Sequence, residues 1–400
     1  MGKMGEIRTT HTIFYADSNR MKELNDESVD LMITSPPYPM IEMWDEVFAK
    51  ENPAIGEALR DKNSNLAFEL MNQLLDGVWQ EVYRILRPGG IACINVGDAT
   101  RTIDGDFKLY PSHSRIMSHC LKTGFQALPE ILWRKQTNAP NKFMGSGMLP
   151  PGAYVTLEHE FILVLRKGGK RKFERQADRR RRKRSAYFWE ERNIWFSDIW
   201  MDMKGARQDL ENENLRKRSA AFPFELAYRL INMFSVKGDV VLDPFLGTGT
   251  SMAAAMASCR NSVGYEIDPN FSDAVAEITN DIVASSNQYI DERLARHLEF
   301  VSKRVASGRS LKYKNENYGF PVMTKQEVGI LINDVREVRM LSNQQIELLY
   351  DPNPQKKYCG LYDEHDEVKC DSTDGQLDAI RRTEESKSRD GILSIQRDLF

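Results

Sequence analysis

Residues 240–251 read VVLDPFLGTGTS, and this stretch decides the fold. Its apolar start predicts a short buried strand that ends in the acidic residue Asp243. A Gly-x-Gly turn at Gly247 and Gly249 follows, and the small residues from Met252 to Ser258 predict a helix. Glycines permit φ > 0 and close approach of a ligand to the backbone, while the helix offers its first N–H groups. The stretch therefore predicts a nucleotide-type pocket at the carboxyl end of a strand.

The next strand narrows the choice of ligand. Residues 261–268 read NSVGYEID, so Glu266 follows the glycine turn by roughly 20 residues and can accept both hydroxyls of a ribose. The position three after Gly249 is Met252, which departs from the dinucleotide fingerprint, and no Gly-Lys-Ser/Thr of a P-loop follows. The pattern favours an adenosine-type ligand that need not carry phosphates.

A second motif, TSPPY at residues 34–38, follows the apolar stretch at residues 29–33. Pro36 and Pro37 fix φ and have no backbone N–H, so this loop is a rigid, extended turn that presents carbonyl acceptors. Tyr38 could cover the π-face of a flat group whose amine binds those carbonyls. A nucleobase amine fits this description, although a proline-capped surface turn is the alternative for the motif taken alone.

The two motifs together resemble those of the S-adenosylmethionine-dependent amino-methyltransferases of DNA, which modify an exocyclic nitrogen of cytosine or adenine. The catalytic loop precedes the cofactor turn, which is similar to the family's beta group, where the target-recognition segment lies between them. Ser35 resembles the N4-cytosine branch, whereas aspartate is usual for N6-adenine. Over roughly residues 10–275, the resemblance implies S-adenosylmethionine as cofactor and double-stranded DNA as substrate. It also implies a restriction-modification setting with a cognate endonuclease in the same system, and it does not imply direct contact between the two proteins.

The resemblance also implies residue roles. The Ser35 hydroxyl and the Pro36 carbonyl would accept the two amine protons and orient the nitrogen lone pair toward the methyl group. Tyr38 would stack on a base flipped out of the duplex, and Trp133 would form a second wall of the base pocket. The implied catalytic set is Ser35, Pro36, Pro37 and Tyr38. The implied cofactor-binding set is Asp17, Thr34, Phe222, Asp243, Pro244, Phe245, Gly247, Gly249, Thr250 and Glu266.

A basic segment spans residues 166–184, between the catalytic and cofactor motifs. Such charge density repels itself and is relieved by phosphates, so contact with the DNA backbone is expected, with a solvated loop as the alternative. The expected DNA-binding residues are Lys170, Arg171, Lys172, Arg179, Arg180, Arg181, Arg182, Lys183 and Arg184. Trp195 and Trp200, which follow this segment, are expected to be core residues.

The expected fold class is α/β, a doubly wound and mostly parallel sheet of the class I (Rossmann-like) methyltransferase type. Strands are expected near residues 12–16, 29–34, 91–96, 130–134, 159–166, 239–243 and 262–267, and helices notably at 66–86 and 112–122. The expected domains are 1–137 (catalytic half), 138–215 (core strand plus basic recognition segment), 216–275 (cofactor half), 276–350 (helical extension) and 351–400 (polar, loosely ordered tail). Within the extension, residues 278–306, 324–334 and 342–350 are expected to be helices.

Composition agrees with a large soluble enzyme, since the 400 residues are 41% hydrophobic and 28% charged with a net charge of −3. Five scattered cysteines without Cys-x-x-Cys spacing argue for the cytoplasm and against a zinc site, and none follows the proline that C5-cytosine methylation would require. No apolar run reaches the roughly 20 residues of a membrane span. N6-adenine methylation and a non-catalytic DNA-binding protein remain as alternatives, and the intact motifs argue against the latter.

Overall fold

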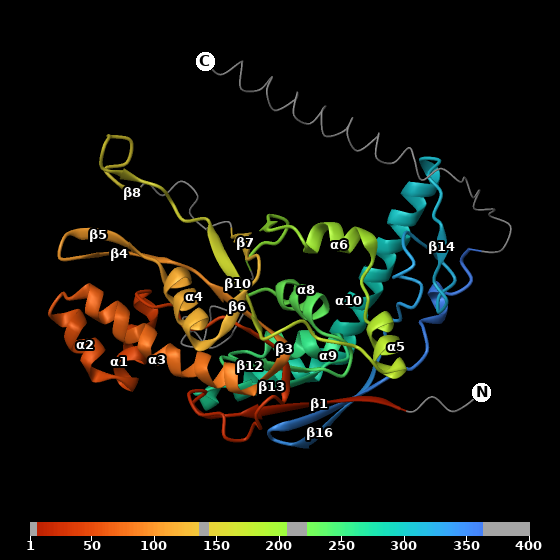
Figure 1. Ribbon diagram of the computed structural model, residues 1–400, viewed down its shortest axis with the longest axis horizontal. Helices are drawn as coiled ribbons and strands as arrows, with labels where there is room; N and C mark the ends of the chain where they lie inside the picture. The colour runs from red at the N-terminus through yellow and green to blue at the C-terminus, as the bar shows by residue number, and fades with distance from the viewer. Residues whose placement is uncertain (1–5, 136–143, 206–221, 363–400) are drawn as a thin grey trace, which may run out of the picture.

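A computed structural model of the chain describes residues 6–135, 144–205 and 222–362. The strands are β1 (Ile7–Phe14), β2 (Val29–Thr34), β3 (Leu86–Val96), β4 (Ala99–Ile103), β5 (Asp106–Tyr110), β6 (Phe125–Ala127), β7 (Ile131–Arg134), β8 (Met144–Gly145), β9 (Ala153–Tyr154), β10 (His159–Lys167), β11 (Ile199–Trp200), β12 (Val240–Asp243), β13 (Asn261–Tyr265), β14 (Tyr313–Lys314), β15 (Pro321–Val322), β16 (Val335–Ser342) and β17 (Gln345–Tyr350). The α-helices are α1 (Asp45–Glu51), α2 (Pro53–Arg60), α3 (Ser64–Ile85), α4 (Ser112–Thr123), α5 (Gln176–Arg184), α6 (Trp189–Trp195), α8 (Phe224–Phe234), α9 (Thr250–Ala257) and α10 (Ser272–Ala306). Figure 1 shows how these elements are arranged.

One large sheet organises the molecule, in the order β11-β7-β10-β3-β2-β12-β13-β1-β17-β16, with β6 beside β10. The central pairs β3–β2, β2–β12, β12–β13 and β13–β1 are parallel. β10 runs antiparallel to both β3 and β7. A parallel centre with helices between its strands confirms the predicted α/β fold.

Helices cover both faces of this sheet because alternate residues of its strands point to opposite sides. On β2, Met32 packs with α3 and α4 residues in one core cluster, whereas Leu31 and Ile33 pack with α8 and α9 residues in another. β2 is fully buried along its length, which explains its continuous apolar sequence. The sheet is therefore doubly wound, and a ligand can approach it at the strand ends.

The two sequence motifs come together because β2 and β12 are neighbouring parallel strands, with Leu31 beside Val241 and Met32 beside Leu242. Both strands end at the same edge, so the loop after Thr34 and the turn after Asp243 lie next to each other. Some two hundred residues of sequence separate these loops. The parallel pairing of β2 with β12 brings them together in space.

The C-terminal extension differs from the prediction. The long helix is confirmed as α10, but residues 324–334 form a turn followed by irregular chain, and residues 342–350 hold the last residue of β16, a turn and strand β17, so both of those helix predictions are wrong. β16 and β17 form a hairpin that pairs antiparallel with β1, and Figure 1 shows it beside β1 at the edge of the sheet. Alternating burial of Ile346 and Leu348 fits a strand, and such a short apolar run does not distinguish strand from helix by spacing. Residues 363–400 of the expected tail lie outside the described residues.

Trp195 and Trp200, which follow the basic segment, are core residues as predicted and are 4% and 1% exposed. Trp200 donates its indole N–H to the Trp195 carbonyl at 3.1 Å, so the polar end of the ring is satisfied inside the core. Among the described residues, no helix is long and apolar enough to cross a bilayer.

Candidate active site

A cavity of about 750 Å³ lies at the carboxyl ends of β1, β2, β12 and β13. It brings together most of the residues that the sequence motifs single out. Ten of them line it: Asp17, Ser35, Pro37, Phe222, Asp243, Pro244, Phe245, Gly247, Thr250 and Glu266. Ser35 from the TSPPY loop therefore faces the same space as the residues of the glycine turn, and a small molecule bound by the turn would lie beside this serine.

Asp243 is the buried acid at the end of β12. Its Oδ1 accepts hydrogen bonds from Thr34 Oγ1 at 2.6 Å and from the Phe245 backbone N–H at 3.0 Å, and its Oδ2 accepts from Ser251 Oγ at 2.5 Å. Burial raises the pKa of Asp243, and the two hydroxyl donors oppose that shift. Thr34, fully buried, thus lies behind the cavity and holds Asp243 in place, so it supports the ligand site from outside the lining.

Glu266 joins the end of β13 to the glycine turn. Its Oε2 accepts the Gly247 N–H at 2.8 Å and its Oε1 accepts the Asp268 N–H at 2.9 Å, so the carboxylate is fixed while it faces the cavity. Burial raises the pKa of Glu266 above its usual value, and these backbone N–H groups counteract that rise. Each carboxylate oxygen keeps lone-pair capacity for a ligand hydroxyl.

The glycine turn needs glycine at Gly249, which has φ +92° and immediately precedes α9. A side chain in this left-handed conformation would be strained, and α9 could then not begin at Thr250. Gly249 itself is not among the cavity-lining residues, so its part in the site is to shape the turn.

The lining is acidic, which bears on the type of ligand. Six carboxylate residues line the cavity: Asp17, Glu46, Glu51, Asp243, Glu266 and Asp268. Among the described lining residues, Lys50 alone is a lysine or arginine. Such a lining suits hydroxyl donors and cationic groups and disfavours phosphates. Together with the aromatic and apolar side chains beside it, the lining fits an adenosine-type cofactor that carries a positive charge.

Several lining residues lie outside the sequence motifs. They are Trp44 just before α1, Phe48 of α1, Leu75 and Val78 of α3, and Ile267 after β13. Ile267 is 51% exposed although apolar, and its position directly after the acidic strand end is a signal that could have identified it. The α1 and α3 residues look like ordinary amphipathic helix positions, and only the folded chain brings them to the site.

The TSPPY loop is arranged differently from the prediction at its last residue. Tyr38 is only 8% exposed, its ring belongs to the core cluster under β2 and β3, and it does not line the cavity. Its hydroxyl contacts Ser35 Oγ at 2.9 Å and donates to Glu160 Oε2 at 3.0 Å. In this structure Tyr38 therefore points inward, whereas stacking on a base would require an exposed ring face. Pro36 likewise is not part of the lining.

Trp133 does not form a wall of the cavity. Its side chain is 1% exposed, packs in the core with Trp195 and Trp200, and donates its indole N–H to the Met203 carbonyl at 3.2 Å. The expected base-pocket role is corrected on this ground, because a ring enclosed on both faces cannot stack on a ligand. Trp133 instead supports the neighbouring strand β10, where it is paired with Glu160.

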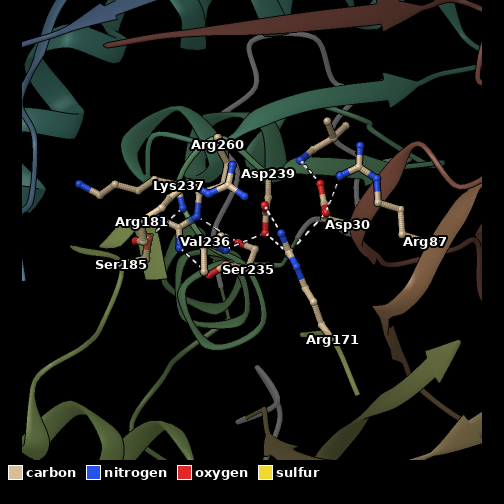
Figure 2. A network of polar contacts seen from close by, with 12 residues as sticks. Asp30, Arg87, Arg171, Arg181, Ser185, Ser235, Val236, Lys237, Asp239 and Arg260 are labelled. Atoms are coloured by element: carbon tan, nitrogen blue, oxygen red, sulfur yellow. Dashed lines mark hydrogen bonds and ion pairs between the residues drawn. The ribbon is translucent and has the colours of Figure 1, made fainter. Parts of the chain in front are cut away.

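The basic segment lies near the amino ends of the central strands, opposite the carboxyl ends where Ser35 lies. Arg171 binds Asp239 with two nitrogens at 2.6 and 3.0 Å and lies 3.4 Å from Asp30, as Figure 2 shows. Asp30 and Asp239 are buried at the amino ends of β2 and β12, and Asp30 is roughly 13 Å along β2 from Thr34 at 3.3 Å per residue. The expected phosphate contact of Arg171 is corrected accordingly: its guanidinium neutralises two buried carboxylates.

The remaining cations of the segment are arranged on and before helix α5. Lys170, Lys172, Arg179, Arg180, Arg182 and Lys183 are exposed, and Arg181 and Arg184 are half-buried. The segment is anchored by Arg171 at one end and by Ser185 at the other, where Ser185 Oγ accepts the Lys237 backbone N–H at 2.9 Å. Their contact with DNA stays a prediction. Across the described ranges no cluster of side chains suited to hold a metal ion is present.

Comparisons with known proteins identify the family of this chain. The DNA methylase family profile matches residues 29–277. The Type II methyltransferase M.MthZI of Methanothermobacter thermautotrophicus is 50% identical over 353 residues, 88% of this chain and 98% of that protein. M.MjaI of Methanocaldococcus jannaschii is 50% identical over 283 residues, 68% of this chain and 92% of that protein. The crystal structure of TTHA0409, a putative DNA modification methylase from Thermus thermophilus complexed with S-adenosyl-L-methionine, is 32% identical, covers 68% of this chain and 94% of that one, and has a TM-score of 0.53. The chain belongs to the DNA methylase family.

Proposed function

We propose that this chain is a site-specific DNA methyltransferase that transfers the methyl group of S-adenosylmethionine to the exocyclic N4 of a cytosine flipped out of double-stranded DNA. The observation that carries the proposal is the shared cavity, in which Ser35 lies beside Asp243 and Glu266. The Thermus relative was crystallised with this cofactor, and two relatives that are each 50% identical in sequence are named Type II methyltransferases. These names support a restriction-modification role in which the enzyme protects DNA.

Different residues of the cavity would bind different parts of the cofactor. Glu266 would accept the ribose hydroxyls, Asp17 the adenine amino group, and the acidic lining near Asp243 would face the charged methionine end. Phe222 and Ile267 offer apolar surface for the adenine ring. When bound, the cofactor supplies an electrophilic methyl group on a positively charged sulfur.

The catalytic loop would act on the amine rather than on the cofactor. An exocyclic amine is a poor nucleophile because its lone pair is delocalised into the ring, so acceptors that bind both N–H groups draw the nitrogen toward sp³ geometry. Ser35 Oγ and the Pro36 carbonyl would be these acceptors, and they would orient the lone pair toward the methyl group. The base must leave the duplex to reach them, since a paired amine is shielded inside the stack.

The choice of cytosine rests on Ser35, which stands where the adenine-specific branch has aspartate. N6-adenine methylation is the second candidate, because the same acceptors suit either amine. The experiment incubates the full chain with S-adenosylmethionine carrying a labelled methyl group and with plasmid DNA, and then identifies the labelled nucleoside by mass after hydrolysis. We expect N4-methylcytosine. N6-methyladenine would reassign the base, and DNA without label would overturn the proposed function.

A further inference from the structure

A continuous chain of hydrogen bonds leads from the cavity into the core. Ser35 lines the cavity, its Oγ lies 2.9 Å from Tyr38 Oη, and Tyr38 Oη donates to Glu160 Oε2 at 3.0 Å. Asn95 Nδ2 donates to both groups, to Tyr38 Oη at 3.0 Å and to Glu160 Oε2 at 2.7 Å. Lys135 Nζ donates to Glu160 Oε1 at 2.8 Å. The carboxylate thus accepts from three donors and closes the chain.

This chain has a fixed direction. A phenol carries one proton, and Tyr38 donates it to Glu160, so the hydrogen bond between Ser35 and Tyr38 must use the proton of Ser35. Ser35 Oγ is left with lone pairs only toward the cavity. It can therefore accept an N–H of a cytosine or adenine amine, whereas a carbonyl oxygen in the same place, as in thymine or guanine, would meet another lone pair.

We propose that Glu160 is the positioning residue that makes Ser35 an acceptor, and that it is the terminal acceptor of the proton released by the amine. This inference rests on the proposed function and deepens it by giving the reaction a route for its proton. It also gives Tyr38 a task that does not require an exposed ring.

The step balances as follows. The N–C bond forms as the C–S bond breaks, and the electron pair of the C–S bond stays on the cofactor sulfur, which becomes a neutral thioether. In the same step the nitrogen, which becomes cationic as the N–C bond forms, gives a proton to Ser35 Oγ, while Ser35 passes its own proton to Tyr38 Oη and Tyr38 passes its own to Glu160. Both hydroxyls end as they began, and Glu160 ends as a neutral carboxylic acid.

The surroundings of the chain fit such a relay. Tyr38 and Glu160 are each 8% exposed, and a Cβ on Gly97 would come within 3.0 Å of the Tyr38 ring, so the ring is tightly held. Burial, and then the charge of Glu160, raise the pKa of Tyr38 well above its ordinary value, so the phenol keeps its proton and can only pass one on. The Lys135 side chain, which contacts Glu160, is 39% exposed, so this end of the chain of hydrogen bonds is close to solvent.

Titratable groups near Glu160 come from two other elements. Tyr38 approaches from the loop after β2 and Lys135 from the end of β7, while β3 contributes the neutral Asn95. Lys135 also lies 5.5 Å from the Trp133 ring centroid, which restricts its ammonium to this position. Among the described residues, these are the charged or titratable side chains that contact the carboxylate.

The test measures single-turnover methyl transfer to DNA between pH 6 and 9 for the wild type, Tyr38→Phe and Glu160→Gln. Tyr38→Phe keeps the ring and loses the relay, and Glu160→Gln keeps an acceptor but cannot take a proton. We expect each to lower the rate on the order of 10²-fold, the size typical of lost proton transfer. The wild-type rate should also fall in D₂O, because protons move along the chain during the reaction, and both variants should lose this solvent isotope effect. Glu158→Gln, which alters an exposed neighbour paired with Arg134, is the matched control and should retain the wild-type rate.

Calorimetric affinity for S-adenosylmethionine, expected to be unchanged in the variants, shows that they are folded. A wild-type rate in Tyr38→Phe, or a Glu160→Gln enzyme with the wild-type solvent isotope effect, would overturn the relay while the proposed function stands. If Glu160→Gln does not fold, the rate and the isotope effect of Tyr38→Phe decide by the same criterion. A wild-type chain that methylates no base amine would instead overturn the proposed function, and the relay with it.

Discussion

The backbone N–H groups of Gly247, in the glycine turn, and of Asp268 hold the carboxylate of Glu266 in place. This carboxylate must be ionised to accept two ribose hydroxyls. Because burial raises its pKa, Glu266 takes up a proton at a higher pH than an ordinary glutamate does. Protonation removes acceptor capacity, so we expect the Kd for S-adenosylmethionine to rise as pH falls through this raised pKa. Isothermal titration calorimetry from pH 8 down to pH 5 measures the effect.

Glu266→Gln is the control for this prediction. It keeps the shape of the side chain and cannot titrate, so its affinity should be about ten-fold weaker at neutral pH, the loss of roughly 1.4 kcal/mol expected for a charged hydrogen bond. Asp243 shifts in the same direction and is present in both proteins, so the difference between the two curves isolates Glu266. Parallel curves for the wild type and the variant would assign the pH effect elsewhere.

Single residues were predictable where a strand end fixes their position. Asp243 and Glu266 follow buried strands, and Ser35 follows β2, so parallel pairing was enough to place all three in one cavity. The orientation of Tyr38 was not predictable, because it depends on Glu160, whose contact with it joins residues 122 apart in sequence. The burial of Trp133 has the same cause: the sequence identifies a large aromatic side chain but not which neighbours enclose it.

The exposed cations of helix α5 lie near the amino ends of the central strands, whereas Ser35 lies at the carboxyl ends. If Arg179, Arg180 and Lys183 bind phosphates, replacing all three by Gln should weaken DNA binding and reduce the slope of log K against log salt by about 0.9 for each phosphate that is no longer neutralised. Titrations of a labelled duplex between about 50 and 300 mM salt measure this slope.

The matched control replaces Arg296 and Lys303, which are exposed on α10 and paired within that helix, by Gln. We expect this variant to keep the wild-type salt slope. The same slope in the α5 variant would show that α5 lies outside the DNA footprint and serves, through Arg171 and Ser185, to hold the amino edge of the sheet.

Elements were predictable where periodicity and length agree. The strands β2, β10 and β12 and the helices α3 and α4 were expected within two residues of their observed bounds, whereas β3 begins five and α10 six residues earlier than expected. The β16–β17 hairpin was not, because its apolar residues fit helical spacing over a short run and only the free edge of β1 selects the strand. The β4–β5 hairpin was missed because it lies on the surface and pairs only with itself.

The β16–β17 hairpin makes the C-terminal extension part of the same sheet that carries the cavity. Leu348 of β17 is fully buried in a core cluster with Leu246 of the glycine turn and Met252 of α9. Leu348→Ala should therefore lower the free energy of unfolding by about 2–5 kcal/mol, the cost of removing a buried leucine. Urea denaturation followed by circular dichroism measures this change in a single transition. Met340→Ala, at a side chain 57% exposed on β16, should change stability by less than about 0.5 kcal/mol. Equal effects of the two substitutions, or a separate transition for the hairpin, would mean that the extension folds independently of the methyltransferase core.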